Sequence, residues 1–509
     1  MRELSIISFN VNGLISFMKR RGYTESTFSR LIENICVNEE VKNNCLNVEK
    51  PDIICIQECK MSFKEDLNNS TGCPENYESY FSLAENNKRY SGVATYCLKD
   101  TIMVIEAGRG FSWLETSPRQ FDINQMMKEE NLKDIELSIT NIKDKYGVTI
   151  SEINGEGRCV ITDHKHFILL NLYVPLLRSK TEEKEEKEQV LFNGIQTQNQ
   201  NQTQEEPLEN VDPERLRYRL AFHEYLNLSL HVLKHLCGRK VILAGDFNII
   251  LEKIDCFADF RRFLGDNKLE DCQVLNPTEI LEKSSFDQIY SEMRKLNTEM
   301  IKRYNLVDVY RHYYPKIQSK YTCWNQMNQS RIRNQGARID LFLISKEMVS
   351  ESTKCEILDH IYGSDHCPIL LILKMKEPES MCSLGRSKPP SICSRYLPQC
   401  KQKQSTISQF LVLSKGEIKN QCNKTIKSQD FKINCKNSDS SKKLSSNYPH
   451  CKHGIPCIKK KVTKPGINKG KLYWGCSKSD QQKCNTFAWV EEANNKNETN
   501  HNLKNFIIK

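Results

Sequence analysis

The chain has 509 residues, a net charge of +10, 22 cysteines and a hydrophobic fraction of only 38%. This length allows two or three domains, and the low hydrophobic fraction predicts that part of the chain is linker or insertion. No apolar run is long enough to span a membrane and residues 1–7 lack a secretory pattern, so we expect an intracellular protein whose cysteines are reduced or bound to metal. The net positive charge favours a polyanionic partner.

The first part of the chain predicts short buried strands that end in polar residues. Asn10 follows the first of these strands, Glu58 follows the second, and Tyr173 lies at the end of another. The predicted elements are a strand at 4–9, a helix at 24–46, strands at 52–58 and 90–96, and a hairpin of strands 157–161 and 166–173.

The next part begins with residues 178–212, whose Glu, Lys, Gln and Asn content predicts a disordered insertion. A helical pattern at 213–237 leads into a buried strand at 240–246, which ends in Asp246. Two more strands, 337–344 and 367–373, complete an α/β sandwich that we expect to end near residue 376. The composition then changes to that of a linker over 377–448.

Several of the strand ends carry residues suited to phosphoester hydrolysis. That reaction needs oxygen ligands for a hard cation, a positioned water and donors for the charge on phosphorus. Glu58 and Asp365 are suitable ligands and Asn10 can add an amide oxygen. Asp246 and Asn248, two residues apart on extended backbone, can hold a water and a phosphate oxygen on one side.

His366 directly follows Asp365 on a turn and can donate to a phosphate oxygen. Asp340 could fix the tautomer of that imidazole, as carboxylates commonly do. Taken singly, a strand-end aspartate is more often a turn or capping residue, and a lone histidine is more often structural. The order of the motifs along the chain is more informative than any one of them.

That order resembles the exonuclease III-like AP endonucleases, AP endonuclease two type, of the endonuclease/exonuclease/phosphatase superfamily. The resemblance covers residues 1–376 apart from the insertions, and it implies a four-layered α/β sandwich. The matching motifs are Asn10-Val11-Asn12-Gly13, Gln57-Glu58, Tyr173-Val174-Pro175, Gly245-Asp246-Phe247-Asn248, Leu306-Val307-Asp308-Val309-Tyr310-Arg311-His312, Tyr321-Thr322-Cys323-Trp324, Arg338-Ile339-Asp340 and Ser364-Asp365-His366.

The resemblance also implies roles for individual residues. Mg²⁺ would be bound principally by Glu58, and Mn²⁺ should replace it because both accept oxygen ligands. Asp246 would handle the attacking water, and Tyr173 would contact the phosphate. The metal set is Asn10, Glu58, Asp246, Asn248, Asp365 and His366; the catalytic set is Tyr173, Asp246, Asn248, Asp340 and His366; the DNA contacts are Tyr90, Arg158 and Arg338.

Two positions differ from the pattern of the best-known AP endonucleases. Leu176 stands where a polar Asn is usual, and Ala337 replaces a bulky aromatic residue. These two residues would leave the site more open beside the extruded sugar. We therefore expect weak incision at abasic sites, with 3′–5′ exonuclease and 3′-end cleaning activity dominant.

Residues 404–411, within the linker, match the spacing of the motif that docks on the sliding clamp, proliferating cell nuclear antigen. Gln404 is at the first place, Ile407 at the fourth and Phe410 at the seventh, while Leu411 stands where a second aromatic residue is usual. One short turn would set the two apolar side chains on a common side as a plug for an apolar pocket. The alternative is a stray apolar patch.

Residues 449–490 predict a small zinc domain followed by a polar tail at 491–509. Their thiolates and imidazole suit tetrahedral Zn²⁺, and the segment has too little core to fold without a metal. It resembles the GRF-type zinc finger, which binds single-stranded DNA, and Lys471 and Trp489 would contact that strand. The implied ligands are Cys451, His453, Cys476 and Cys484, with Cys457 as a possible substitute for His453.

The leading hypothesis is therefore a nuclear, magnesium-dependent DNA-repair phosphodiesterase with clamp and single-stranded DNA partners. One alternative is another branch of the superfamily, such as a phospholipid or inositol phosphatase. A second is a clamp- and DNA-binding scaffold with weak or no catalysis.

Overall fold

The computed structural model describes most of residues 1–400 and a smaller part of the chain that follows. The described residues are 2–36, 50–85, 89–177, 211–257, 279–280, 286–325, 330–375, 388–400, 451, 453, 457–461, 471–476, 484 and 487–489. The chain divides into two units, Met1–Leu413 and Ser414–Lys509, and each is described by itself. The expected clamp motif at 404–411 and nearly all of the expected insertion lie outside the described residues.

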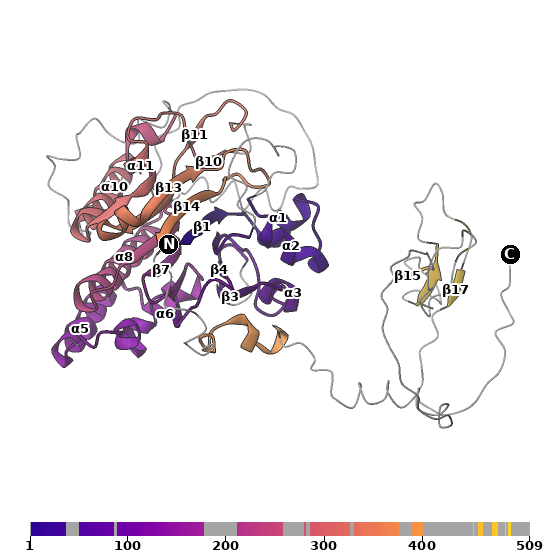
Figure 1. The fold of residues 1–509 in the computed structure, drawn as a ribbon, viewed down its shortest axis with the longest axis horizontal. Helices are drawn as coiled ribbons and strands as arrows, with labels where there is room; N and C mark the ends of the chain where they lie inside the picture. The colour runs from indigo at the N-terminus through magenta and orange to yellow at the C-terminus, as the bar shows by residue number, and fades with distance from the viewer. Residues whose placement is uncertain are drawn as a thin grey trace, which may run out of the picture. The chain divides into compact units, whose positions relative to one another are not determined.

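Two six-stranded mixed sheets lie face to face in the first unit (Figure 1). The first sheet has the order β13 (Ser352–Ile357), β14 (Ile369–Met375), β1 (Arg2–Asn10), β2 (Ile53–Gln57), β4 (Val93–Leu98) and β3 (Tyr77–Ser82). The second has the order β5 (Glu106–Arg109), β6 (Cys159–Asp163), β7 (Ile168–Tyr173), β8 (Val241–Asp246), β12 (Asp340–Ser345) and β9 (Leu306–Asp308). β10 (Cys323–Trp324) and β11 (Gly336–Ala337) form a separate antiparallel pair.

Each six-stranded sheet contains one parallel pair at its centre, β1–β2 in the first and β7–β8 in the second. The other neighbouring strands in both sheets are antiparallel. Because two parallel strands run in the same direction, their carboxyl ends emerge at one edge of the sheet.

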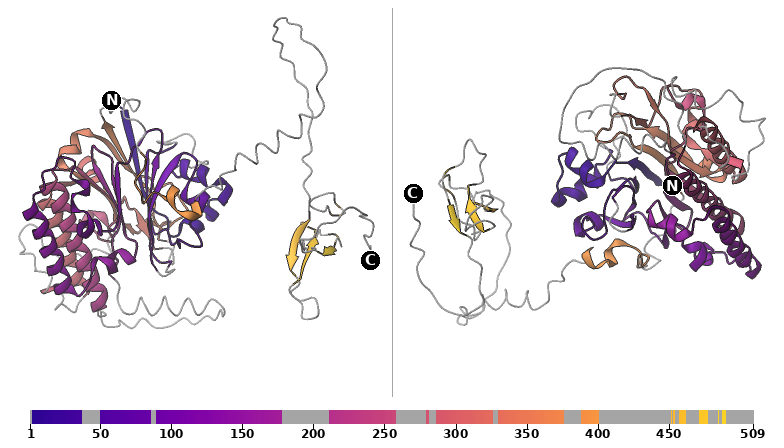
Figure 2. Two further views of the ribbon diagram at one scale, coloured as in Figure 1. Left: turned by 90° about the horizontal axis from the view of Figure 1, so that it is seen from below. Right: turned by 180° about the vertical axis from the view of Figure 1, so that it is seen from behind.

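Helices cover the outer face of each sheet, which gives the expected four layers (Figure 2). The first sheet is covered by α1 (Leu14–Arg20), α2 (Phe28–Glu33) and α3 (Asn69–Gly72), and the second by α4 (Trp113–Thr116), α5 (Glu129–Tyr146), α6 (Ile150–Gly155), α8 (Pro213–Leu230) and α10 (Phe286–Arg303). α11 (Val309–Tyr313) follows β9, and the short helical turns are η1 (Glu25–Thr27), η2 (Pro118–Phe121), η3 (His231–Leu236), η4 (Lys253–Asp255), η6 (Lys346–Glu351), η7 (Ser394–Tyr396) and η8 (Pro398–Cys400).

The alternation of side chains along each strand explains this layering. On β1, Leu4 and Ile6 join the core between the two sheets, whereas Ile7 and Phe9 join the core beneath the helices. Strands covered on both faces are apolar throughout, as in sheets with helices on one side and a second sheet on the other. α8 begins where Asp212 caps the backbone N–H of Glu214, with Pro213 in the first turn.

Most of the strands expected from the sequence are present within a few residues of the expected bounds. The helix expected at 24–46 is described only as η1 and α2, because residues 37–49 lie outside the described part of the chain. The strands β3 and β13 and the long helices α5 and α10 are additional elements that the sequence reasoning missed.

Part of the segment expected to be linker is folded against the first sheet. Residues 388–400 lie along β3, where Cys393 pairs with Tyr80 as an isolated bridge and Arg395 forms an ion pair with Glu78 at 2.8 Å. The first unit thus extends beyond the expected boundary at 376, because buried cysteines of this segment contribute to both cores of the first sheet.

The second unit contains a three-stranded antiparallel sheet of β15 (Ile458–Lys461), β16 (Leu472–Gly475) and β17 (Phe487–Trp489). Its strands carry the segments expected to form a zinc finger. Within the described parts of both units, no helix is long and apolar enough to cross a bilayer.

Candidate active site and zinc centre

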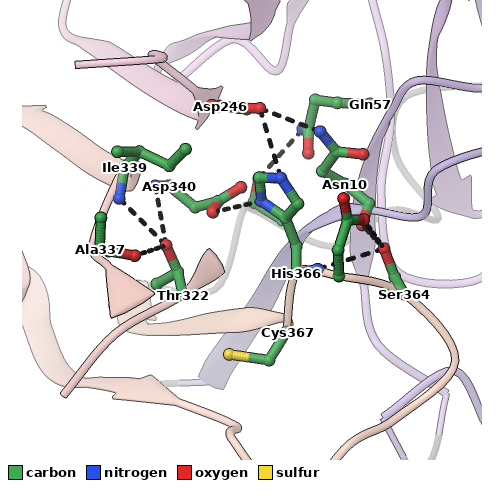
Figure 3. Close-up of polar contacts among 12 residues, drawn as sticks. Asn10, Gln57, Asp246, Thr322, Ala337, Ile339, Asp340, Ser364, His366 and Cys367 are labelled. Carbon is green, nitrogen blue, oxygen red and sulfur yellow. Dashed lines mark hydrogen bonds and ion pairs between the residues drawn. The ribbon is translucent and has the colours of Figure 1, made fainter. Parts of the chain in front are cut away.

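The candidate active site lies at one end of the interface between the two sheets. The inward-facing row of β1 runs from Leu4 and Ile6 to Ser8 and Asn10, and so changes from apolar to polar along the strand. The row on β8 changes in the same way and ends at Asp246. The two rows meet where the Asn10 amide donates to Asp246 Oδ2 at 2.9 Å (Figure 3).

Glu58 enters the site from the residue that follows β2. Its φ of 51° lies in the left-handed region, which side chains other than Gly and Asn rarely adopt and which is typical of functional turns. Asn10 donates to Glu58 Oε1 at 2.9 Å, and the ammonium of Lys60 lies 2.9 Å from Oε2. Burial raises the pKa of Glu58, but Lys60 and the Asn10 hydrogen bond outweigh burial and leave the pKa below its ordinary value.

Asp246 lies opposite Glu58, and both of its oxygens have partners. Oδ2 accepts from Asn10, and Oδ1 accepts the backbone N–H of Asn248 at 2.9 Å. The side chain is 1% exposed. Burial, followed by the nearby Asp340 carboxylate, raises the pKa of Asp246 to about 7. Two hydrogen bonds and burial therefore fix the position of this carboxylate.

His366 completes the constellation from the opposite side. Its Nδ1 lies 2.8 Å from Asp340 Oδ2, and its Nε2 lies 3.9 Å from Asp246 Oδ2 (Figure 3). Burial disfavours the imidazolium, but Asp340 outweighs burial and raises the pKa of His366 well above its ordinary value. The backbone around His366 is fixed by Ser364, whose hydroxyl donates to Asn10 O at 2.8 Å. The carboxylate–imidazole pair expected from the sequence is therefore present.

Three of the expected metal ligands form one group. One ligand atom each from Glu58, Asp246 and His366 lies within 4.8 Å of the others, and carboxylate oxygens suit a hard divalent cation. The Asn10 oxygen instead accepts the backbone N–H of Asn12 at 3.1 Å, so the amide nitrogen is directed at the carboxylates.

The other two expected ligands lie further out. Asp365 accepts from Asn12 Nδ2 and from the Ser364 hydroxyl, both at 3.0 Å. Asn248 has a left-handed φ of 49° and donates its side-chain amide to Val174 O at 2.9 Å. Both side chains are therefore engaged within the protein, and they border the group of three rather than belong to it.

Tyr173 meets the site from the end of β7, where its hydroxyl hydrogen-bonds Glu58. The guanidinium of Arg158 stacks on the Tyr173 ring at 4.7 Å and pairs with Glu156. Arg158 is only 3% exposed, so in this structure it supports Tyr173 from within the protein, and its contact with DNA stays a prediction. Tyr90 is 39% exposed and remains available at the surface.

Arg338, another expected DNA contact, is also buried in this structure. It is 1% exposed and lies in a buried ion-pair cluster with Asp255 and Asp308, at 2.7 Å from each. Its backbone N–H donates to Asp255 O at 2.7 Å. The cluster fixes the turn that precedes Asp340, because a buried guanidinium needs carboxylate partners.

The second unit brings together the four expected zinc ligands. Ligand atoms of Cys451, His453, Cys476 and Cys484 lie within 4.8 Å of one another, and the sulfurs of Cys451 and Cys476 lie 3.6 and 3.5 Å from His453 Nδ1. This set of three sulfurs and one imidazole suits tetrahedral zinc. Cys457 is buried nearby but is not one of the four. Lys471 is exposed on the same unit.

Lys60 is the site residue that sequence reasoning missed. Besides Glu58, its ammonium donates to Asn12 Oδ1 at 2.6 Å, so one cation connects the turns after β1 and β2. The position of Lys60 two residues beyond Glu58 indicated that it could lie near the site. Its side chain enters the site only because the backbone at Glu58 and Lys60 is left-handed, with φ values of 51° and 50°.

The fold and this site bring acidic and imidazole groups together between two sheets, an arrangement suited to metal-assisted phosphoester chemistry. Residues 7–366 match the Endonuclease/Exonuclease/phosphatase family, and the chain belongs to that family. Residues 449–493 match the GRF zinc finger. Both matches confirm the resemblances expected from the sequence.

The chain is also similar to several curated proteins. The chain is 26% identical over 404 residues to DNA-(apurinic or apyrimidinic site) endonuclease 2 of Schizosaccharomyces pombe, covering 77% of this chain and 62% of that protein. It is 26% identical over 420 residues to the human protein of that name, covering 80% of this chain and 66% of that protein. The Saccharomyces cerevisiae protein of that name is 23% identical, with 96% of this chain and 97% of that protein covered. The chain thus spans less than two thirds of the fission yeast and human relatives.

Proposed function

We propose that this chain is a DNA-repair phosphodiesterase that hydrolyses DNA at 3′ ends and at abasic sites with Mg²⁺. The observation that carries the proposal is the convergence of Glu58, Asp246 and the Asp340–His366 pair within one constellation. The names of the curated relatives, an endonuclease acting at apurinic or apyrimidinic sites and an exodeoxyribonuclease, support DNA as the substrate.

The residues divide the reaction among them. Glu58 and its neighbours would hold a divalent cation, which supplies charge neutralisation for the phosphate when bound. Asp246, held by Asn10 and by the backbone of Asn248, orients the attacking water. His366 carries its proton toward the phosphate while Asp340 fixes the ring. Tyr173, whose hydroxyl interacts with Glu58, would contact the phosphate.

The substrate preference is proposed from two side chains, Leu176 three residues beyond Tyr173 and Ala337 on β11. Leu176 is 36% exposed and Ala337 is half-buried, so neither provides the polar or bulky wall usual beside an extruded abasic sugar. We expect weak abasic incision and dominant 3′–5′ exonuclease and 3′-end cleaning activity. Rates measured on an abasic duplex and on a recessed 3′ end decide this point, and much faster abasic incision rejects it.

The C-terminal modules complete the proposal. The zinc finger would bind single-stranded DNA through basic and aromatic side chains such as Lys471 and Trp489. Gln404, Ile407, Phe410 and Leu411 would dock on the sliding clamp from outside the described residues. These partners imply a nuclear protein.

The test is magnesium-dependent digestion of a DNA labelled at its 3′ end, by the wild-type chain and by Asp246→Asn. We expect digestion by the wild type only, because the amide cannot accept a proton from water. Asp144→Asn, on the α5 surface, serves as the control. Equal activity of Asp246→Asn means that the water-activating residue is misassigned, and an inactive wild type that still binds DNA supports the scaffold alternative. Hydrolysis of inositol phosphates but not DNA favours the phosphatase branch.

A further inference from the structure

Arg219 on α8 is a fully buried cation held mainly by backbone carbonyls. It is 1% exposed, and no carboxylate of the described residues forms an ion pair with it. Other buried arginines, such as Arg158, Arg239 and Arg338, each pair with a carboxylate. Since burying a guanidinium without a counter-ion has a large desolvation cost, Arg219 needs another explanation than ion pairing.

The carbonyls that Arg219 contacts belong to the two loops that leave β7 and β8. One terminal nitrogen donates to Pro175 O, and the other lies 3.2 Å from Asn248 O and 3.5 Å from Phe247 O. Pro175 is two residues beyond Tyr173, and Phe247 directly follows Asp246. A single planar guanidinium therefore spans both loops that deliver side chains to the active site.

The two loops are also joined directly, at points between Arg219 and the site. Val174 N–H donates to Asp246 O at 2.8 Å, and the Asn248 amide donates to Val174 O at 2.9 Å. Arg219 reinforces this junction and holds Asn248, whose φ of 49° is left-handed. Burial lowers the pKa of Arg219 to about 10, so the side chain remains a cation at neutral pH.

We propose that Arg219 is a positioning residue for phosphodiester hydrolysis, which fixes the separation of the Tyr173 and Asp246 loops through their backbone carbonyls. This inference rests on the proposed function. Its physical basis is pre-organisation: a small displacement of a reacting group, of about 1 Å, lowers the rate by roughly 100-fold without a large change in substrate affinity. The planar fork of arginine can reach both loops at once, whereas the point charge of lysine cannot.

The experiment compares Arg219→Met and Arg219→Lys in the full chain with Arg217→Met as the matched control. Arg217 lies on the exposed side of the same helix, two residues away. kcat and KM are measured with magnesium on a recessed 3′ end, and each value is normalised to the folded fraction from urea titration. We expect kcat to fall about 10- to 100-fold in Arg219→Met, less in Arg219→Lys, with KM within about twofold. Arg217→Met should match the wild type.

A second measurement separates positioning from folding. Millimolar guanidinium ion, added to Arg219→Ala, should restore part of kcat by occupying the space left by the side chain, and should leave wild type and Arg217→Met unchanged. If Arg219→Met is folded and has the wild-type kcat, the positioning role is overturned but the proposed function is not. The same holds if unfolding accounts for the whole loss of activity. A wild-type chain without magnesium-dependent activity on DNA overturns the proposed function, and this role with it.

Discussion

Replacing Asp340 with asparagine removes the carboxylate that hydrogen-bonds His366 and that also, through its charge, helps to raise the pKa of Asp246. The substitution keeps the shape of the side chain and removes its charge. Asp340 Oδ2 lies 2.8 Å from His366 Nδ1, while Oδ1 has no hydrogen-bond partner among the described residues. The imidazole is therefore the main polar partner that the carboxylate would lose.

The expected magnitude follows from that single contact. A hydrogen bond to a charged group contributes about 1.5–3 kcal/mol, and about 1.36 kcal/mol corresponds to a factor of ten in rate. If the contact is fully used in the transition state, kcat of Asp340→Asn falls by roughly 10- to 150-fold. The pKa of His366 should also fall toward its ordinary value, because the Asp340 carboxylate is the largest cause that raises it.

The assay combines kcat on a recessed 3′ end with an NMR titration of His366 in EDTA-treated protein. Because the folded pKa of His366 is raised, its contribution to stability is complete below the unfolded pKa of about 6.5 and is lost as pH rises through the folded value. The variant should lose that contribution at lower pH. Asp359→Asn, where the carboxylate pairs with Lys320 and is 41% exposed, is the control. An unchanged kcat or an unchanged His366 titration refutes the reasoning.

Three further predictions concern other parts of the molecule. Lys60→Met removes the cation that competes with a metal for Glu58, so at pH 8 the Mg²⁺ concentration for half-maximal activity should fall about two- to fivefold; a higher requirement contradicts this. Cys476→Ser should remove one zinc per chain and weaken binding to single-stranded DNA while the urea midpoint of the catalytic unit stays unchanged; retained zinc, measured by metal analysis, would exclude its role as a ligand. Burial lowers the pKa of His223 to about 3, so the folded state keeps this side chain neutral and its effect on stability is absent above pH 6.5 and grows as pH falls below it. Between pH 6 and pH 4 the free energy of unfolding should therefore fall less steeply in His223→Gln than in the wild type, by up to about 1.4 kcal/mol per pH unit. Parallel curves of urea midpoint against pH would refute this.

The strands and the charged residues at their ends could be predicted because burial and alternation are visible in a sequence. An apolar run followed by Glu58 or Asp246 indicates a strand that ends in a carboxylate. The spacing of Cys451, Cys476 and Cys484 likewise indicates a metal site, since a segment so short needs one to fold. In both cases the local pattern and the tertiary structure impose the same requirement.

The roles of the basic residues could not be predicted in the same way. Arg158 and Arg338 are buried in ion pairs, and Arg219 is buried against carbonyls, although arginines at such positions are usually exposed. Whether an arginine points outward depends on a partner distant in the sequence, such as Asp255 for Arg338. Lys60 depends instead on a pair of left-handed turns that residue type alone does not indicate.

The location of the site follows from the one parallel pair in each sheet. In β1–β2 and in β7–β8 the carboxyl ends of both strands emerge together, so each sheet delivers two neighbouring polar ends to one edge. With the sheets face to face, these edges meet, and the hydrogen bond from Asn10 to Asp246 joins them across the interface. Antiparallel pairs would send one end of each pair to the opposite edge. Asn10 is the only described side chain that donates a hydrogen bond to both Glu58 and Asp246. An Asn10→Ala variant that remains folded should therefore increase the mobility of both carboxylates together.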